Sequence, residues 1–571
     1  MANRGRRKFL KTIPLAAALP AVFEPVRLNS QTKQSDRSEI STDTLREAEK
    51  IDAIAFTDGE RAGMTGNLAA NRSNYEAIRR IDVDYDVEPA FFFEPLARSK
   101  PAGRATPRAP ITVDRPRIST RPDDEELAFL PLTALASLIQ SRVVSSSELT
   151  QLYLGRLARY GPKLECVVTL TADLARAQAA DADREIRAGR YRGPLHGIPY
   201  GIKDLFATKN IRTTWGAAPY VDRVPSIDAT AVERMRDAGA VLLAKLTTGE
   251  LAVGDVWFGG KTRNPWDTSR GSSGSSAGPA SATAAGLVGV SIGTETGGSI
   301  VSPASTCGVA GLRPTYGRSS RYGCMTLRWT MDKVGIIGRG VEDTVVVLNA
   351  IYGPDGRDRT VADTPFAWRG VRPLSELKIG VVSDEFATEP READARGRWP
   401  ETRRTLEAAL DALRRAGATL QPVTFPDMQA NAIYAILNAE AGAAFDDLVR
   451  AGHAGELAGK GANDRANQLR FARFIPAVEY LRAQRVRTRL GEQMEDLMAR
   501  YDVIVTPSTS PSVTITNLTG HPAVTVNAGF ASGLPVGLMF TGRLYDEATL
   551  AGAALAFERA RGAQVERPRI S

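Results

Sequence analysis

The stretch from Gly271 to Tyr322 constrains this chain most, because it is built from glycine, serine and other small residues around one apolar run. That run, from Gly286 to Ile292, predicts a buried strand between two loops. The second loop, Gly293 to Ser299 (GTETGGS), has two glycines immediately before a serine. Glycines leave backbone N–H groups uncovered, so several of them can point at one spot. The loop therefore predicts an oxyanion hole beside a nucleophilic serine.

This stretch resembles the signature of the amidase signature family of serine hydrolases. The family pattern GGSSGG…GS-D-TGGSIR-P-A is matched at 273–278 (SGSSAG) and 293–304 (GTETGGSIVSPA), with the spacing between the two serines kept. Several motifs in the right order are more specific than one, and the resemblance covers roughly Leu127 to Glu558. The further matches are GIPYGIKDLF at 197–206, GLRPTYGR at 311–318, YDVIVTP at 501–507 and GLPVG at 533–537.

The resemblance implies acyl transfer by a Ser-Ser-Lys arrangement. In this arrangement Lys203 would act as the base, Ser275 as the relay and Ser299 as the nucleophile. In the family, the residue at the position of Ser275 follows a cis peptide bond. The chemistry needs neither a metal ion nor an organic cofactor. The oxyanion would be held by backbone N–H groups of Ser299 and of Thr296, Gly297 and Gly298.

Lys203 can serve as a base only if its pKa falls well below the reference value of about 10.4. Burial disfavours the charged form of lysine, and the apolar sequence GIPYGIK, which ends at Lys203, makes a lowered pKa credible. Two positions depart from the family pattern. Glu295 stands where the family usually has Asp, which keeps the charge but lengthens the side chain. Val301 stands where the family often has Arg.

The residue at position 301 bears on the substrate. An arginine can hold a carboxylate by two parallel hydrogen bonds, and Val301 offers no such group beside Ser299. We therefore expect a neutral pocket floor and a preference for neutral, apolar or aryl acyl amides. The alternative is that Arg313, Arg321 or Arg328 approaches the pocket from elsewhere in the chain.

Two other assignments compete with the Ser-Ser-Lys arrangement. Ser276 is the central residue of GSSAG, which fits the G-x-S-x-G elbow of α/β-hydrolases, and His521 would then be the base of an esterase. That elbow requires an apolar strand directly before it, and residues 264–273 (NPWDTSRGSS) are not apolar. The second alternative is an A-like subunit of a tRNA-dependent amidotransferase. An export signal and the lack of a basic face argue against that alternative.

The formal net charge of +8 does not indicate a nucleic-acid-binding face, because of where the charges lie. Residues 1–30 carry a net charge of +5 and residues 96–122 a net charge of +6, so the rest of the chain has a net charge of −3. A basic tail and a basic linker do not form a binding face. We therefore expect no nucleic acid as a partner. The other expectations are a small-molecule amide as the partner, no stable membrane span, and a homodimer as the candidate assembly.

The three cysteines, Cys166, Cys307 and Cys324, form no CxxC pair and no cluster with histidine. Their odd number and apolar settings predict buried free thiols in place of a disulfide framework. We therefore expect no metal site.

The N-terminus has the features of an export signal. A basic segment that contains Arg6 and Arg7 precedes an apolar run from Ile13 to Phe23, which is too short to span a bilayer comfortably. The hexamer RRKFLK at 6–11 is similar to a twin-arginine signal. We therefore expect residues 1–24 to direct the protein to the periplasm or cell envelope, with a cytoplasmic location if the signal is not functional. No small-x-small cleavage site stands out, so removal of the segment or its retention as an anchor stays open.

The rest of the chain divides by composition. Residues 25–95 predict a helical N-terminal extension that ends in an apolar cluster at 90–94. Residues 96–124 predict a linker rich in Pro and Arg. The amidase domain is predicted over residues 125–560, and residues 561–571 form a C-terminal tail.

Within the predicted domain, helical patterns alternate with short apolar runs. Ser145 and Glu148 form a capping-box pattern before one helix, and a second helix is predicted over 172–187. This alternation argues for an α/β fold, and the family resemblance implies one large mixed sheet with helices on both faces. Residues 428–500 predict mostly helix and are a source of walls for the substrate pocket. Buried strands are predicted at 240–245, 377–382 and 502–505.

Overall fold

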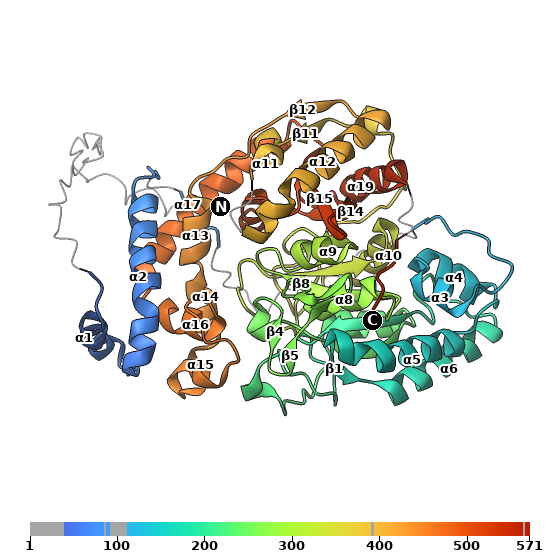
Figure 1. Ribbon diagram of the computed structural model, residues 1–571, viewed down its shortest axis with the longest axis horizontal. Coiled ribbons are helices and arrows are strands. Elements are labelled where there is room, and N and C mark those ends of the chain that lie inside the picture. Colours follow the sequence, from blue (N-terminus) through green and yellow to red (C-terminus); the bar gives the residue numbers. More distant parts are fainter. Residues whose placement is uncertain (1–38, 85–86, 92–110, 390–392, 563–565, 571) are drawn as a thin grey trace, which may run out of the picture. The chain divides into compact units, whose positions relative to one another are not determined.

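The chain is built around one eleven-stranded mixed sheet (Figure 1). The computed structural model describes residues 39–84, 87–91, 111–389, 393–562 and 566–570, and the helices and strands in these ranges lie within Ile40–Ser571. The strand order is β1-β3-β2-β8-β10-β9-β14-β15-β13-β11-β12. β2 is parallel to β3 and β8, β11 is parallel to β12 and β13, and the other neighbours are antiparallel. The strands of this sheet are β1 (Val167–Leu170), β2 (Pro199–Lys203), β3 (Val241–Leu246), β8 (Val290–Glu295), β9 (Ala310–Arg313), β10 (Lys333–Gly338), β11 (Ile379–Val381), β12 (Leu420–Pro422), β13 (Val503–Pro507), β14 (Ala523–Ala531) and β15 (Leu534–Gly542).

One face of the sheet is covered by a helical layer that includes α10, α12 and α19. Leu312 of β9 and Phe540 of β15 belong to the hydrophobic cluster of this layer, and the centroid of the Phe540 ring lies 5.6 Å from that of Phe557 in α19. The helices that contribute to this cluster include α3 (Asp124–Phe129), α4 (Leu132–Gln140), α5 (Ser146–Leu164), α6 (Ala172–Arg187), α7 (Thr230–Asp237), α10 (Val341–Ile351), α12 (Ala393–Arg415) and α19 (Glu547–Arg561).

The opposite face is covered by α8 (Ala277–Ala284) and α9 (Val301–Cys307), with α11 (Ser383–Ala387) and α18 (Ser512–Leu518) nearby. Gly311, next to Leu312 in β9, faces this side, where a Cβ atom would lie 2.7 Å from Cβ of Ala304 in α9. Only glycine at position 311 allows α9 to approach the sheet this closely. Helices on both faces of one large mixed sheet confirm the predicted fold class.

Residues 430–498 form five α-helices, and the N-terminal helices pack against them. Figure 1 shows α2 beside α13, and α2 also contacts α16 and α17. The Phe91 ring stacks on Tyr480 of α17 with a centroid separation of 6.2 Å, while residues 92–94 of the predicted apolar cluster lie outside the described residues. The helices are α1 (Thr42–Asp52), α2 (Asp58–Arg79), α13 (Ala430–Ile436), α14 (Asn438–Ala444), α15 (Asp446–Arg450), α16 (Arg465–Ala472) and α17 (Ala477–Met498).

Most of the predicted elements are confirmed within a few residues. The capping box at Ser145 and Glu148 forms at the start of α5, and α6 has the predicted bounds of 172–187. The three predicted buried strands correspond to β3, β11 and β13. The predicted signal segment, residues 1–24, lies outside the described residues.

The strand predicted at Gly286–Ile292 is wrong at its start, because β8 begins at Val290 and continues to Glu295. Gly286 has a φ of +64° and turns the chain after α8, and the N–H of Gly289 donates to the Pro199 carbonyl oxygen before the strand begins. Helix α8 was not predicted from the sequence pattern. Two short hairpins follow β3 in the chain, β4 (Val256–Trp257) with β5 (Gly260–Lys261), and β6 (Arg263–Asn264) with β7 (Asp267–Gly271).

Candidate active site

Lys203 is the last residue of β2 and is fully buried. Because β2 runs parallel to β8, the end of β2 lies beside the end of β8, where the oxyanion loop begins. Lys203 Nζ donates hydrogen bonds to Ser275 Oγ at 2.8 Å and to Thr294 Oγ1 at 2.9 Å. The amine also donates to the Thr294 carbonyl oxygen at 3.4 Å, and it forms no ion pair with a carboxylate among the described residues.

Burial lowers the pKa of Lys203 to about 7. The negative charges of Asp332 and Glu295 act in the opposite direction and raise it, but they do not restore the ordinary value. A pKa near neutrality means that a substantial fraction of the amine is unprotonated at physiological pH. An unprotonated amine bonded to a hydroxyl is the state that a general base requires.

Ser275 follows a cis peptide bond from Gly274, as the family resemblance implied. Its side chain is buried, and its carbonyl oxygen accepts a hydrogen bond from the N–H of Gly249. The next N–H along the chain, that of Ser276, donates to the carbonyl oxygen of Ser299 at 3.1 Å. The two serine loops are thus joined directly through the backbone.

Glu295 binds the backbone that directly follows the oxyanion loop. Its Oε2 accepts the N–H groups of Ile300 and Val301 at 2.7 and 2.9 Å, and its Oε1 accepts from Arg313 Nη1 at 2.7 Å. Burial raises the pKa of Glu295, but Arg313 and these hydrogen bonds outweigh that effect and lower it overall. The longer side chain at this position therefore remains an anion that fixes the start of α9, directly after Ser299.

The tip of the loop has unused donors. Among the described residues, the N–H groups of 296–299 have no hydrogen-bond acceptor, and the Ser299 hydroxyl has no hydrogen-bond partner. Ser299 and Gly297 are half-buried, so this tip is accessible from solvent. Free backbone donors beside a free hydroxyl are the groups that acyl transfer requires.

Comparison with known proteins places this arrangement in a family. The family model described as Amidase matches residues 148–515, which is more than half of the chain. The chain belongs to the amidase family. This result agrees with the resemblance to the amidase signature motifs, and it identifies the protein as a hydrolase that acts on C–N bonds.

The proteins to which this chain is similar include amidotransferase subunits and a peptide amidase. It is 34% identical over 492 residues to the A subunit of the glutamyl-tRNA(Gln) amidotransferase of Moorella thermoacetica, an alignment that covers 78% of this chain and 99% of the relative. It is 38% identical to the protein of the same name from Anaeromyxobacter dehalogenans, over 77% of this chain and 97% of the relative. Among solved structures, the native peptide amidase of Stenotrophomonas maltophilia superimposes with a TM-score of 0.67 at 32% identity, over 77% of this chain and 98% of that chain.

The structure does not support the competing α/β-hydrolase assignment, in which Ser276 and His521 would act together. The Ser276 hydroxyl is buried and donates to the Thr294 carbonyl oxygen at 3.1 Å, and it accepts the Thr294 N–H at 3.3 Å. His521 is bonded through Nδ1 to the Thr519 hydroxyl, and burial lowers its pKa to about 3. No hydrogen bond joins Ser276 to a histidine in the described part of the chain, so these two residues do not form a catalytic pair.

Asp332 is a site residue that the sequence motifs did not reveal. Its Oδ1 accepts the Thr296 hydroxyl at 2.6 Å, and its Oδ2 accepts the N–H groups of Leu327 and Arg328 at 2.7 and 3.0 Å. Asp332 therefore ties the oxyanion loop to the segment that precedes β10. It is also the acid with the largest effect on the pKa of Lys203. An aspartate inside a loop without a motif carries no sequence signal for this role.

The Val301 side chain has no surface exposed to solvent. It is fully buried in a small cluster with Val513, Ala523 and Met539. The expectation of a neutral pocket floor, which rested on Val301, therefore loses its basis.

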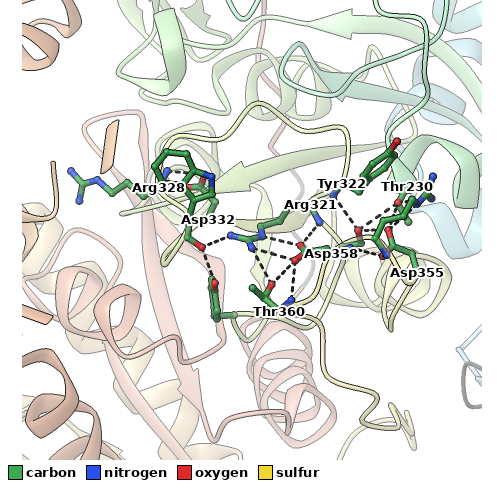
Figure 2. Close-up of polar contacts among 12 residues, drawn as sticks. Thr230, Arg321, Tyr322, Arg328, Asp332, Asp355, Asp358 and Thr360 are labelled. Atoms are coloured by element: carbon green, nitrogen blue, oxygen red, sulfur yellow. Dashed lines mark hydrogen bonds and ion pairs between the residues drawn. The ribbon is translucent and has the colours of Figure 1, made fainter. Parts of the chain in front are cut away.

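The three arginines named as alternatives differ in what they bind. Arg313 is buried with Glu295 at 2.7 Å, and Arg321 bonds to Asp358 through Nε at 3.0 Å. Figure 2 shows Arg321 turned toward Asp358 and Thr360, while the guanidinium of Arg328 extends in a different direction. Arg313 and Arg321 are already paired with carboxylates, and Arg328 is not paired with one in the described part of the chain.

The described residues contain no helix long and apolar enough to cross a membrane. They also contain no group of three or more His, Cys, Asp or Glu side chains that could hold a metal ion. Cys166 and Cys307 are buried and Cys324 is half-buried, and burial raises the pKa of each thiol.

Proposed function

We propose that this protein hydrolyses carboxylic amides through an acyl-enzyme on Ser299, with Ser275 as the relay and Lys203 as the base. The hydrogen bond between Lys203 and Ser275, in a buried setting that lowers the lysine pKa to about 7, is the observation that carries the proposal. Thr296, Gly297 and Gly298 supply backbone N–H groups for the oxyanion. This mechanism requires no metal ion and no organic cofactor.

The reaction proceeds in two half-reactions. Unprotonated Lys203 accepts a proton from the Ser275 hydroxyl as Ser275 takes the proton of Ser299, and Ser299 Oγ attacks the amide carbon. The negative charge on the carbonyl oxygen is held by the free N–H groups of the loop. The proton on Lys203 returns through Ser275 to the leaving nitrogen, and the C–N bond breaks. Water then attacks the acyl-enzyme by the same route and releases the carboxylic acid.

A fluorophosphonate probe tests this proposal on the purified chain alone. We expect stoichiometric labelling, with the modified peptide carrying the probe on Ser299, because the probe reacts with an activated serine next to an oxyanion hole. Peptide mass spectrometry locates the adduct. An adduct on Ser276, or no labelling of a protein that hydrolyses amides, would refute the assignment of the nucleophile.

A second candidate function follows from the names of the relatives, which belong to glutamyl-tRNA(Gln) amidotransferases. The same chemistry on Ser299 would then serve a multi-subunit enzyme. Turnover of amides by the purified chain separates these candidates, because a self-sufficient amidase hydrolyses amides without partner proteins. A chain that acquires amidase activity only with partner proteins from its own source would favour a role within such an assembly.

Export through the predicted twin-arginine segment is a further part of the proposal. Changing Arg6 and Arg7 together to lysine is expected to leave the precursor in the cytoplasm, because that pathway requires the arginine pair. Fractionation of cells that express the full chain measures the distribution. An unchanged distribution would remove the export proposal and would favour a cytoplasmic role in an amidotransferase.

A further inference from the structure

Helix α2 lies before residues 148–515, which the family model matches, and it packs against α13, α16 and α17. Near the C-terminal end of α2, Ile78 is fully buried in the same hydrophobic cluster as Ile433 of α13. Nearer its N-terminal end, Met64 is buried in the same cluster as Leu469 of α16. The N-terminal extension therefore shares its hydrophobic core with the helices of residues 430–498.

Polar contacts fix the position of α2 on these helices. Glu60, in the first turn of α2, accepts a hydrogen bond from Arg470 Nη2 of α16 at 2.6 Å. Near the same end, Asn467 Nδ2 donates to a backbone carbonyl oxygen of α2 at 2.8 Å. At the other end, Arg79 Nε donates to the buried carboxylate of Glu479 in α17 at 3.0 Å. Because hydrogen bonds are directional, these contacts restrict sliding and rotation of α2.

Helix α13 connects α2 with the oxyanion loop. The hydroxyl end of Tyr434 in α13 lies against Gly297, where a Cβ atom would be only 2.4 Å from Tyr434 Oη. The face of the same ring packs on Arg328, whose guanidinium carbon is 4.1 Å from the ring centroid. Tyr434 directly follows Ile433, the residue that shares a cluster with Ile78. Adjacent residues of α13 therefore face α2 and the loop.

Gly297 has few other restraints. Neither its N–H nor its carbonyl oxygen has a hydrogen-bond partner among the described residues. By contrast, the Thr296 side chain is hydrogen-bonded, and the carbonyl oxygens of Gly298 and Ser299 each accept a backbone N–H. The contact with Tyr434 therefore restrains the part of the loop that carries the Gly297 N–H, one of the proposed oxyanion donors.

We propose that Tyr434 positions the oxyanion loop and that α2 holds Tyr434 in place through Ile78. The inference rests on the proposed function, because it concerns the transition state of the reaction at Ser299. A backbone donor stabilises the oxyanion best when it is already in place as the charge develops. The N-terminal extension, which lies outside the matched family region, is then a functional part of the active site.

The variant Ile78→Ala tests the role of α2. It removes side-chain atoms from the cluster that α2 shares with α13 and leaves a cavity, so α13 is held less firmly. We expect kcat to fall about 10-fold and KM to change less than about threefold, because oxyanion donors act mainly in the transition state. Ile78→Val should recover most of the loss. The rate is expressed per Ser299 labelled to completion by the fluorophosphonate, so molecules that fail to fold are not counted.

The matched control is Ile351→Ala. Ile351 of α10 is as deeply buried as Ile78 but belongs to a different hydrophobic cluster, which α10 shares with α19. We expect this variant to lower the midpoint of thermal unfolding by a similar amount and to keep kcat per labelled serine within about twofold of wild type. An equal fall in kcat for both variants would show that any cavity in the core has this effect, and it would overturn the inference.

A double variant tests whether α2 acts through Tyr434. Tyr434→Ala alone should lower kcat about 10- to 100-fold, because it removes the contact with Gly297. Adding Ile78→Ala should then lower kcat by less than about twofold, because substitutions that break one series of contacts are not additive. Independent losses that multiply would overturn the inference, as would an unchanged kcat for Ile78→Ala. Wild-type protein that neither reacts with the fluorophosphonate nor hydrolyses amides would instead contradict the proposed function.

Discussion

Replacing Ser299 by alanine is expected to lower amide hydrolysis by at least about 10³-fold, because the residual activity of serine hydrolases without their nucleophile comes only from the oxyanion hole and substrate binding. The Ser299 hydroxyl makes no hydrogen bond with the described residues and is half-buried, so its removal should change the free energy of unfolding by less than about 0.5 kcal/mol. Steady-state kinetics and a thermal unfolding curve measure the two quantities. A variant that is stable and inactive is the expected result.

The neighbouring serine and the buried histidine are the matched controls for this variant. His521→Ala should retain the Ser299-dependent chemistry, because His521 is bonded to Thr519 and its pKa of about 3 keeps it neutral. Ser276→Ala removes the hydroxyl that binds the backbone of Thr294. We expect this variant to lower the free energy of unfolding and to leave Ser299 able to act as the nucleophile. If His521→Ala abolished activity and Ser299→Ala did not, an α/β-hydrolase mechanism would replace the Ser-Ser-Lys mechanism.

The loops of the site could be located from the sequence because their backbone requires glycine at particular positions, and this requirement leaves a recognisable motif. Gly297 and Gly298 leave N–H groups uncovered, and Ser299 follows them at a fixed spacing. Lys203 was found by its own motif, 72 residues before Ser275, and the structure brings the two side chains into hydrogen-bond contact. The catalytic roles of these residues remain predictions that the proposed experiments test.

The parts that the sequence did not reveal lack a periodic or local signal. Helix α8 consists of small residues that are all buried, so it shows no apolar face and no helical period. The role of Val301 was misjudged because sequence distance from Ser299 says nothing of direction, and its side chain points into the core. Asp332 contacts Thr296 from a separate loop, and only the tertiary fold brings the two residues together.

The pH dependence of the reaction should report the titration of Lys203. Only the unprotonated amine can accept a proton, so kcat/KM is expected to rise with pH through a pKa of about 7 and to level off above it. Lys203→Met should remove this limb and lower kcat/KM by about 10²- to 10⁴-fold. The matched control is Lys333→Met, since Lys333 is also buried with a pKa well below its ordinary value but donates to the Met331 carbonyl oxygen and not to the serines. Its pH profile should keep the acid limb near 7.

Asp332→Asn tests the electrostatic origin of that limb. The negative charge of Asp332 raises the pKa of Lys203, so the neutral amide should let this pKa fall further below 7 and move the acid limb to lower pH. Asparagine keeps an oxygen that can accept the N–H groups of Leu327 and Arg328, so the segment before β10 should stay in place. If the variant only weakened the hydrogen bond to Thr296, the plateau value of kcat/KM would fall and the pH of the acid limb would stay the same. The two readouts therefore separate positioning of the oxyanion loop from the effect of the charge on the pKa of Lys203. A limb that stays at the wild-type pH would show that Asp332 does not set the pKa of the base.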